Sequence, residues 1–150
     1  MDDIDKIMAV METAFDPQWG EAWNRRQVSD SLTTPHTHYR LVDENGTEPK
    51  EGQLAAGFSL IKIAPGEEEL LLVAVQPKSR GTGLGKQLIQ QFTQDARGRN
   101  AERIVLEMRA NNPAETLYRA VGFEPIGRRE RYYSMPDGSK IDAITFAKKL

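Results

Sequence analysis

The segment SRGTGLGKQL, residues 79–88, packs three glycines into five positions between two basic residues. The glycines are Gly81, Gly83 and Gly85, with Arg80 before them and Lys86 after them. A glycine-rich turn that ends at a helix N-terminus offers free backbone N–H groups and the positive end of the helix dipole, and this combination binds phosphate. The segment therefore predicts an anion site with a phosphate group as its ligand.

Two common phosphate-binding patterns do not fit this segment. The dinucleotide fingerprint Gly-x-Gly-x-x-Gly needs a third glycine, but Lys86 or Leu88 stands there, depending on the starting glycine. A P-loop needs glycine where Arg80 stands and Ser or Thr where Gln87 stands. The remaining pattern is Arg80-x-x-Gly83-x-Gly85 followed by Lys86. A tight turn that is rich in glycine for steric reasons alone stays open as an alternative.

The segment lies between a predicted strand and a predicted helix. Residues 70–75, LLLVAV, are six consecutive apolar positions, the pattern of a strand buried on both faces. From residue 85 to about 97, apolar residues recur at helical spacing, which predicts an amphipathic helix. Residues 103–108, RIVLEM, predict a second buried strand.

A short helix is predicted next, with Asn112 as its cap, Pro113 at its first position and Glu115 three residues after the cap. Strand, helix, strand and helix thus alternate over residues 70–123. This alternation predicts a parallel strand pair with a right-handed crossover.

The remaining elements predict a mixed α/β fold. Helical periodicity predicts helices over residues 4–11 and 21–32, separated by the pattern-breaking segment 15–20. Strands are predicted at 36–46, 53–64, 122–133 and 139–147, with turns or loops at 65–69 and 135–138. At 150 residues, the chain has the length of one domain, and we expect residues 1–150 to form it.

Composition excludes several classes of function. With 20 Lys plus Arg against 22 Asp plus Glu and a net charge of -2, nucleic-acid or anionic-membrane binding has no electrostatic support. The absence of cysteine excludes disulfides and a cysteine nucleophile, and fits a reducing cytoplasm. His36 and His38 lack further ligands nearby, so no metal site is expected. Because residues 1–10 are acidic and no apolar run approaches the roughly 20 residues of a membrane span, we expect a soluble, cytoplasmic protein.

Three ordered stretches resemble the GNAT acetyltransferase superfamily, and within it the RimI-like bacterial enzymes that acetylate ribosomal-protein alanine. The stretches are LLLVAVQPKSRGTGLGKQLI at 70–89, VLEMRANNPAETLYRAVGF at 105–123 and GRRERYYSMPDGSKIDAITF at 127–146. FDPQWGEAW, residues 15–23, also resembles the family's loop between its first two helices. The resemblance implies an α/β GNAT fold, with a mixed sheet of about six to seven strands flanked by about four helices.

The resemblance also implies that the anion is the pyrophosphate of acetyl-CoA. The loop residues that would contact it are Arg80, Gly81, Thr82, Gly83, Leu84, Gly85 and Lys86. The strand around Val73, Ala74 and Val75 would separate from its neighbour and offer backbone groups to the pantetheine arm and the acetyl carbonyl. Arg80 and Lys86 would add charge-assisted contacts, with ordinary exposed cations as the alternative.

Acyl transfer from a thioester to an amine needs a base for the amine and a proton for the departing thiolate. Glu107 matches the family's general base, and an acid within an apolar strand is costly unless it is paired or functional. The alternative is a strand-end residue that faces solvent or is paired with Arg109. Glu69 stands where other superfamily members carry their base and is the second candidate, on the substrate side. Tyr118 matches the tyrosine that protonates the thiolate, with helix packing as the alternative.

The spacing of these residues departs from the family in one respect. Glu107 and Tyr118 are eleven positions apart, one fewer than in the resembling enzymes, so two asparagines compete for a coenzyme contact. Asn112 keeps the family's spacing from the glutamate, and Asn111 keeps it to the tyrosine. Because Asn112 also fits a helix cap, we favour Asn111 for the coenzyme contact and keep both residues as candidates.

Tyr132 and Tyr133 resemble the pair that lines the family's peptide slot between the last two strands. A phenol there can bind a substrate backbone while its ring shapes the pocket. Adjacent strand residues face opposite sides of a sheet, so cross-strand packing is the alternative for one of the two.

The expected function is that of an acetyl-CoA-dependent N-acetyltransferase acting on the N-terminal amine of a protein or peptide, with a ribosomal protein as one candidate. Two alternatives are a small-amine acetyltransferase of the polyamine or aminoglycoside type and a coenzyme A-binding module without catalysis. We expect a monomer or a weak dimer, with no direct nucleic-acid or membrane partner.

Overall fold

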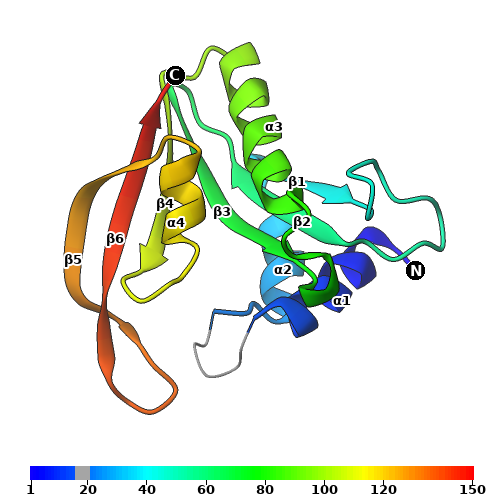
Figure 1. The fold of residues 1–150 in the computed structure, drawn as a ribbon, viewed down its shortest axis with the longest axis horizontal. Helices are drawn as coiled ribbons and strands as arrows, with labels where there is room; N and C mark the ends of the chain where they lie inside the picture. Colours follow the sequence, from blue (N-terminus) through cyan, green and yellow to red (C-terminus); the bar gives the residue numbers. More distant parts are fainter. Residues whose placement is uncertain (16–20) are drawn as a thin grey trace.

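The computed structural model describes residues 1–15 and 21–150, which form a six-stranded mixed sheet with helices on both faces (Figure 1). The strands are β1 (Thr37–Val42), β2 (Gly57–Lys62), β3 (Glu67–Val75), β4 (Arg103–Arg109), β5 (Glu124–Ser134) and β6 (Lys140–Lys149). The helices are α1 (Asp3–Ala14), α2 (Arg25–Leu32), α3 (Leu84–Gly98) and α4 (Glu115–Ala120), with a short 3-10 turn at Pro77–Ser79.

The strand order is β1-β2-β3-β4-β6-β5, and every neighbouring pair is antiparallel except β3 and β4. The predicted parallel pair is therefore confirmed, with α3 as the crossover helix. The long β5–β6 hairpin lies at the opposite end of the sheet from β1 (Figure 1). Within the described ranges, no helix is long and apolar enough to cross a membrane.

The two N-terminal helices begin at reciprocal caps. The Asp2 carboxylate accepts the Asp5 N–H while Asp5 accepts the Asp2 N–H, and Asn24 and Gln27 repeat the arrangement at α2. Because such a capping box defines the first helical turn, the helix expected over 21–32 begins only at Arg25. Most of the pattern break predicted at 15–20 lies outside the described residues.

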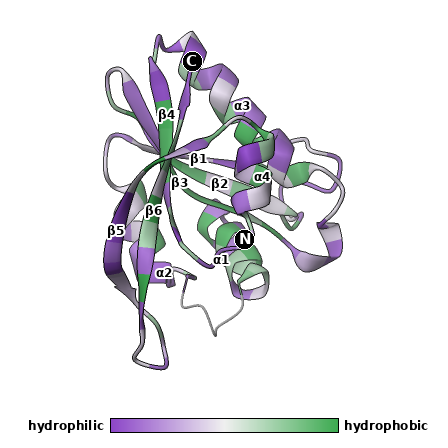
Figure 2. Ribbon diagram, turned by 60° about the vertical axis from the view of Figure 1, so that its left-hand side comes forward, coloured by the Kyte–Doolittle hydropathy of each residue, from purple (hydrophilic) through white to green (hydrophobic). Residues whose placement is uncertain are grey.

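Two hydrophobic layers hold the helices against the sheet. On one face, α1 and α2 pack Ile7, Val10 and Val28 against β2 residues such as Phe58. On the other face, α3 and α4 pack on the sheet through residues that include Ile89, Phe92, Ile104, Tyr118 and Phe146. Edge strand β5, by contrast, is drawn largely in hydrophilic colours in Figure 2 and is exposed along nearly its whole length. The core therefore lies on both faces of the central strands.

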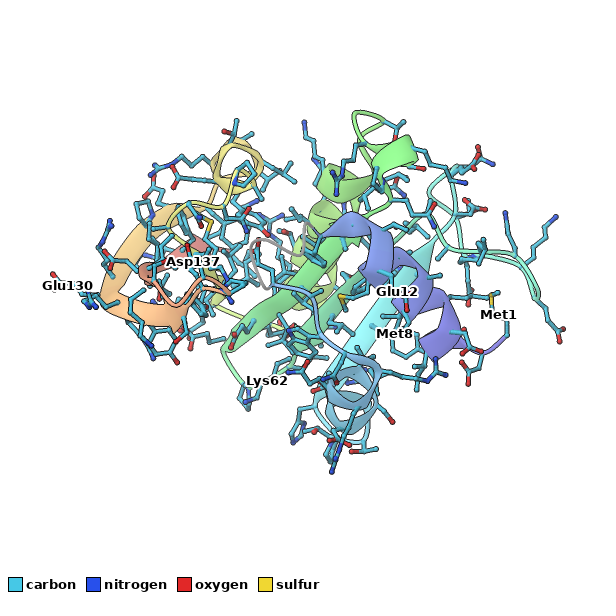
Figure 3. The ribbon with its side chains drawn as sticks, turned by 90° about the horizontal axis from the view of Figure 1, so that it is seen from below. Met1, Met8, Glu12, Lys62, Glu130 and Asp137 are labelled. Atoms are coloured by element: carbon cyan, nitrogen blue, oxygen red, sulfur yellow. The ribbon has the colours of Figure 1, made fainter. Side chains whose placement is uncertain are left out.

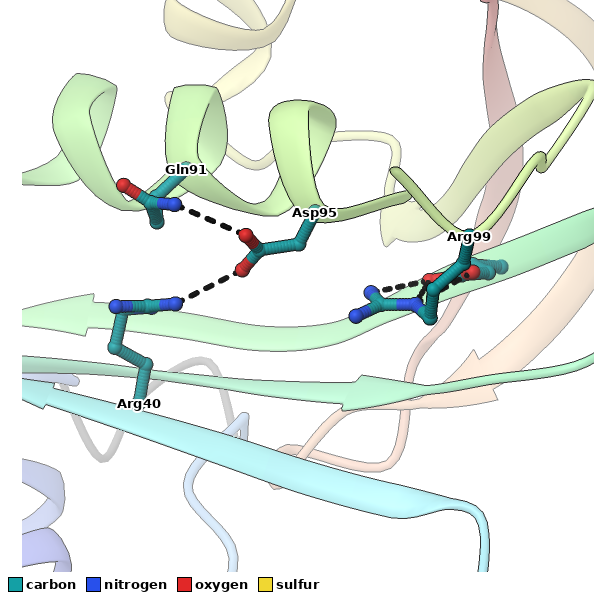
Figure 4. A network of polar contacts seen from close by, with 5 residues as sticks. Arg40, Gln91, Asp95 and Arg99 are labelled. Atoms are coloured by element: carbon teal, nitrogen blue, oxygen red, sulfur yellow. Dashed lines mark hydrogen bonds and ion pairs between the residues drawn. The ribbon is translucent and has the colours of Figure 1, made fainter. Parts of the chain in front are cut away.

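Polar contacts fix the direction of α3 along the sheet (Figure 4). The Glu68 carboxylate on β3 is only 1% exposed and accepts two N–H groups of Arg99 at the end of α3, with distances of 2.7 and 2.9 Å. One turn earlier, Asp95 accepts Arg40 of β1 at 2.9 Å and Gln91 at 3.0 Å. Since these contacts hold the C-terminal half of α3, they also set where its N-terminus and the glycine loop lie.

Strands β3 and β4 separate beyond their first residues. Their pairing joins 67–69 to 103–105 only, although β3 continues to Val75. Opposite the adjacent pair Leu60 and Ile61 of β2, β3 places Leu72 and Leu70, so Leu71 is an extra residue. A bulge of this kind bends a strand and ends pairing. The bend in β3 therefore coincides with its departure from β4.

Three local predictions need correction. Residues 67–69 belong to β3 and not to a loop. Residues 70–75 form the expected strand, but most of its side chains are half-buried because the cleft described below opens beside them. Helix α4 begins at Glu115, since the Asn112 side chain accepts the Ala114 N–H in a turn that precedes the helix.

Candidate active site

A cleft of about 930 Å³ opens where β3 and β4 separate. Its lining residues come from β3, the following loop and the start of α3 (69–75, 79–81 and 83–86), from β4, the next turn and α4 (106–109, 112–114, 117 and 118), and from 14, 15, 21, 23 and 133. Of the predicted site residues, only Thr82, Asn111 and Tyr132 lie outside this lining. The cleft thus joins the glycine loop to side chains on β4 and β5.

The glycine loop adopts a backbone that requires glycine at two positions. Gly81 has φ 78° and Gly83 has φ 88°, in the left-handed region that L-residues with side chains avoid. Gly83 is the N-cap of α3, and no side chain caps this end of the helix. Lys86 lies in the first turn of α3. A cation there is repelled by the positive end of the helix dipole, and an anion bound close by removes this repulsion. The loop therefore has the geometry of an anion site.

Arg80 and Thr82 connect the loop to neighbouring segments. The Arg80 guanidinium donates to the Ala14 carbonyl at the end of α1. A guanidinium has five N–H donors, so this contact leaves donors for an anion as well. The Thr82 hydroxyl donates to the Ser79 carbonyl at 2.5 Å, which supports the turn.

Glu107 lies on β4 with its side chain 22% exposed and three partners around its carboxylate. It accepts the Tyr133 hydroxyl at 3.3 Å and the Thr145 hydroxyl at 3.3 Å, and its Oε2 lies 3.5 Å from Nε of Arg129. The Glu107 carboxylate therefore has polar partners on β5 and β6 and also lines the cleft.

Glu69 on β3 provides a second carboxylate near the separation of the strands. Burial raises the pKa of Glu69, Lys62 counteracts this, and the charge of Glu107 raises it further. Glu69 is in register with Val105, two residues before Glu107, so the two carboxylates lie on the same face of neighbouring strands. The two carboxylates therefore bring negative charge to this edge of the cleft, beside the Arg129 guanidinium, and can accept a cationic amine.

Tyr118 of α4 is 8% exposed and packs edge-on against Phe123, with ring centroids 6.1 Å apart. Burial, followed by the charge of Glu21, raises the pKa of Tyr118 to about 12. The phenol therefore keeps its proton at neutral pH and can donate it within the cleft.

The two adjacent tyrosines of β5 differ in their surroundings. Tyr133 is half-buried and lines the cleft, whereas Tyr132 is 51% exposed and does not. Burial, then the charge and hydrogen bond of Glu107, raise the pKa of Tyr133 to about 12. Tyr132 instead packs edge-on against the Tyr133 ring and lies beside the Arg129 guanidinium.

Sequence reasoning missed Glu21 as a cleft residue and considered Arg109 only as a pairing partner of Glu107. Glu21 is half-buried and accepts the Asn112 side-chain N–H at 3.0 Å; burial raises its pKa, and the charge of Arg109 counteracts this. The Arg109 guanidinium lies 4.3 Å from the centroid of the Tyr133 ring. The alternation of strand residues could have revealed Arg109, two positions after Glu107. Glu21 was expected in the helix over 21–32 and instead lies before α2, which begins at Arg25.

The structure also separates the two candidate asparagines. Asn112 lines the cleft and uses its side chain for both Glu21 and the Ala114 N–H. Asn111 is exposed and lies outside the lining. Asn112 is thus the better placed of the two for a ligand contact. In the part of the chain that the structure describes, no three His, Asp or Glu side chains form a metal-binding group.

These features define a class of enzyme. A glycine loop at a helix N-terminus, the Glu107 carboxylate and the Tyr118 phenol meet in one cleft between separating parallel strands. Such an arrangement suits group transfer from a phosphate-bearing cosubstrate. The chain belongs to the acetyltransferase (GNAT) family, whose profile matches residues 4–123. The predicted family, GNAT fold and acyltransferase class are thereby confirmed.

Within this family, the chain is similar to several N-acetyltransferases. The chain is 35% identical to N-alpha-acetyltransferase RimI of Mycobacterium tuberculosis over 130 residues, which cover 85% of this chain and 76% of that protein. It is 33% identical to the ribosomal protein bS18-alanine N-acetyltransferase of Escherichia coli over 126 residues, 83% of this chain and 79% of that one. A crystal structure of the Escherichia coli ribosomal-protein alanine N-acetyltransferase superimposes with a TM-score of 0.78 at 24% identity, covering 98% and 87% of the two chains.

Proposed function

We propose that this protein transfers the acetyl group of acetyl-CoA to the α-amine at the N-terminus of a protein or peptide. The observation that carries the proposal is the single cleft joining the glycine loop to the Glu107 carboxylate. Relatives with 33% and 35% identity over most of the chain bear names for N-alpha or ribosomal-protein alanine acetylation, and they support this acceptor. An N-terminus of a ribosomal protein is therefore the first protein substrate to test.

The loop fits the pyrophosphate of coenzyme A. A Cβ at Gly81 or Gly83 would meet no other part of the described protein within 4 Å, so the loop faces open space. Its N–H groups, the uncapped start of α3 and the cations Arg80 and Lys86 would hold the phosphates. The backbone of Val73, Ala74 and Val75, together with Asn112, would hold the pantetheine arm. Bound acetyl-CoA supplies an acetyl group activated as a thioester.

The side chains of the cleft would move two protons. Glu107 accepts the proton of the attacking amine as the new C–N bond forms. Tyr118 donates its proton to sulfur as the C–S bond breaks, which its pKa of about 12 permits at neutral pH. An α-amine has an ordinary pKa near 8 and is mostly protonated at neutral pH. Glu69 and Glu107 therefore also attract the acceptor in its ammonium form, which releases one proton to solvent before the neutral amine attacks.

The direct experiment measures thiol release from acetyl-CoA with short peptides that differ in their first residue, and with spermidine and an aminoglycoside alongside. We expect turnover only with peptides, highest with alanine or serine first. Turnover only with the small amines would overturn the acceptor that we propose. Coenzyme binding without turnover on any acceptor would support a binding module instead.

The base is tested by Glu107→Gln, which keeps the size and hydrogen bonding of the side chain but removes its basicity. We expect kcat/KM for the best peptide to fall by about 10² to 10⁴ with unchanged coenzyme affinity. Glu69→Gln tests the second candidate base, and we expect a smaller loss of kcat/KM. Glu115→Gln is the control, because Glu115 pairs with Arg119 on α4 and lies outside the cleft lining. A larger loss for Glu69→Gln than for Glu107→Gln would reverse the assignment.

A further inference from the structure

Strand β5 contains an irregularity beside the cleft. Arg129 pairs with Ala143 and Tyr133 pairs with Ile141, so residues 130–132 of β5 lie opposite the single residue Asp142 of β6. Three residues facing one means that β5 carries two extra residues at this point. Such a bulge changes where the following side chains of the strand lie along its partner.

The bulge contains a strained residue. Arg131 has φ 51°, in the left-handed region that residues with a side chain avoid. Strain of this kind persists only where surrounding contacts stabilise it. Glu130, the first residue of the bulge, points away from the molecule in Figure 3, so it adds no contact to the cleft.

Asp142 makes the contacts that hold the bulge. Its Oδ1 accepts the Arg131 backbone N–H at 2.8 Å, and its Oδ2 accepts Nε of Arg128 at 2.6 Å. These two hydrogen bonds, the Arg131 one first, lower the pKa of Asp142, so the acceptor stays ionised. The Asp142 backbone carbonyl also accepts the Ala110 N–H at 2.9 Å, which ties this position to the end of β4.

The bulge determines which residue of β5 reaches Glu107. In a regular ladder continued from the pair of Arg129 and Ala143, Arg131 would lie opposite Ile141. Tyr133 would then lie two residues, or about 7 Å, farther along the hairpin. In the bulged strand Tyr133 occupies the place opposite Ile141, and its hydroxyl donates to Glu107 at 3.3 Å.

We propose that Asp142 is a positioning residue: its carboxylate holds the bulge at Arg131, and the bulge places the Tyr133 phenol on Glu107 at the acceptor side of the cleft. Asp142 itself does not line the cleft, so it acts through Tyr133. A bulge also protects an edge strand from pairing with other chains. Edge protection alone, however, would not connect Asp142 to the environment of Tyr133.

The first test compares Asp142→Ala with Asp142→Asn, which retains an acceptor for the Arg131 N–H. We expect the alanine variant to raise KM for the peptide about tenfold with unchanged coenzyme affinity, and the asparagine variant to stay within about twofold of the wild type. Asp137→Ala is the matched control, because Asp137 accepts the N–H and hydroxyl of Ser139 at the tip of the same hairpin. An asparagine variant as impaired as the alanine variant would overturn the proposed contact.

The second test leaves Asp142 in place and covers the case in which Asp142→Ala does not fold. Arg131→Gly and Arg131→Val both remove the arginine side chain, but only glycine readily adopts the left-handed backbone. We expect the glycine variant to keep the wild-type KM and the β-branched valine variant to raise it about tenfold. Equal KM values for the two variants would overturn the bulge as the positioning element.

The kinetic tests rest on the proposed function, because they need an acceptor substrate. A third test needs none. In protein with ring-labelled tyrosine, NMR titration with Tyr133→Phe as the assignment reference gives the pKa of Tyr133. We expect it to fall from about 12 towards the ordinary value near 10 in Asp142→Ala and Arg131→Val. If wild-type protein acetylates no peptide, the proposed function fails while this titration still tests the bulge. An unchanged Tyr133 pKa in both variants overturns the inference.

Discussion

The phenol of Tyr118 is buried against Phe123 and keeps its proton far above neutral pH. Sequence reasoning left two explanations for this residue, a proton donor and a packing residue, and the structure shows features of both. Packing uses the ring, whereas proton donation needs only the hydroxyl. The two explanations can therefore be separated by a substitution that removes the hydroxyl and keeps the ring.

Tyr118→Phe is that substitution. We expect kcat to fall by about 10²-fold, because the thiolate loses its proton donor, while coenzyme affinity stays the same. Tyr39→Phe is the control. Tyr39 lies on edge strand β1, away from the cleft, and its hydroxyl donates to Asp3. The measurement is steady-state acetylation of the best peptide. Wild-type kcat in Tyr118→Phe would assign Tyr118 to packing alone.

Single residues of the site differed in how predictable they were. Glu107 stood out because it is an acid within an apolar strand, and the structure gives it three polar partners. Glu21 was expected in a helix over 21–32 but lies before α2, so neither its burial nor its contact with Asn112 could be inferred. The choice between Asn111 and Asn112 depended on where the turn before α4 ends, and turn geometry at that precision is set by tertiary contacts.

At the level of elements, the loop before α3 is the feature that the sequence predicted best. Two of its glycines have left-handed φ values, and such positions leave a clear mark because other residues are excluded there. The bulges at Leu71 and Arg131 leave no comparable mark. Neither residue is a glycine, and register depends on which strand lies alongside, so these two irregularities appear only in the folded sheet.

The anion loop is tested by Gly83→Glu. We expect coenzyme binding to be lost, because the new carboxylate would lie in the phosphate site and repel the phosphates. Gly138→Glu is a matched control: Gly138 also has φ 88°, and a Cβ there also meets no protein atom within 4 Å, but it lies in the β5–β6 turn. Both variants carry the same backbone strain and the same added charge. Calorimetric titration with coenzyme A measures the outcome, and wild-type affinity in Gly83→Glu would contradict the loop assignment.

At the scale of the whole molecule, three tyrosines in different regions share one electrostatic property. The pKa is raised to about 12 for Tyr39, chiefly by its hydrogen bond to Asp3, and for Tyr118 and Tyr133, chiefly by burial. In the unfolded chain each titrates near 10. Folding therefore strengthens proton binding on edge strand β1, on α4 and on β5 alike, and global stability must depend on pH in the alkaline range.

The sign of that dependence follows from proton binding. Below pH 10 the tyrosines are protonated in both states, so their contribution to stability is fully present; between pH 10 and 12 the unfolded chain releases protons that the folded protein retains. The free energy of unfolding therefore falls with rising pH, and buried Tyr118 alone accounts for about 2 to 3 kcal/mol, from its shift to about 12. Lysines titrate in the same interval and contribute equally to the wild type and to Tyr118→Phe. Comparing the urea unfolding of the two proteins between pH 8 and 11.5 therefore isolates the contribution of Tyr118. We expect the variant to lose less stability than the wild type above pH 10, and parallel pH profiles would show that Tyr118 ionises as readily in the folded protein as in the unfolded chain.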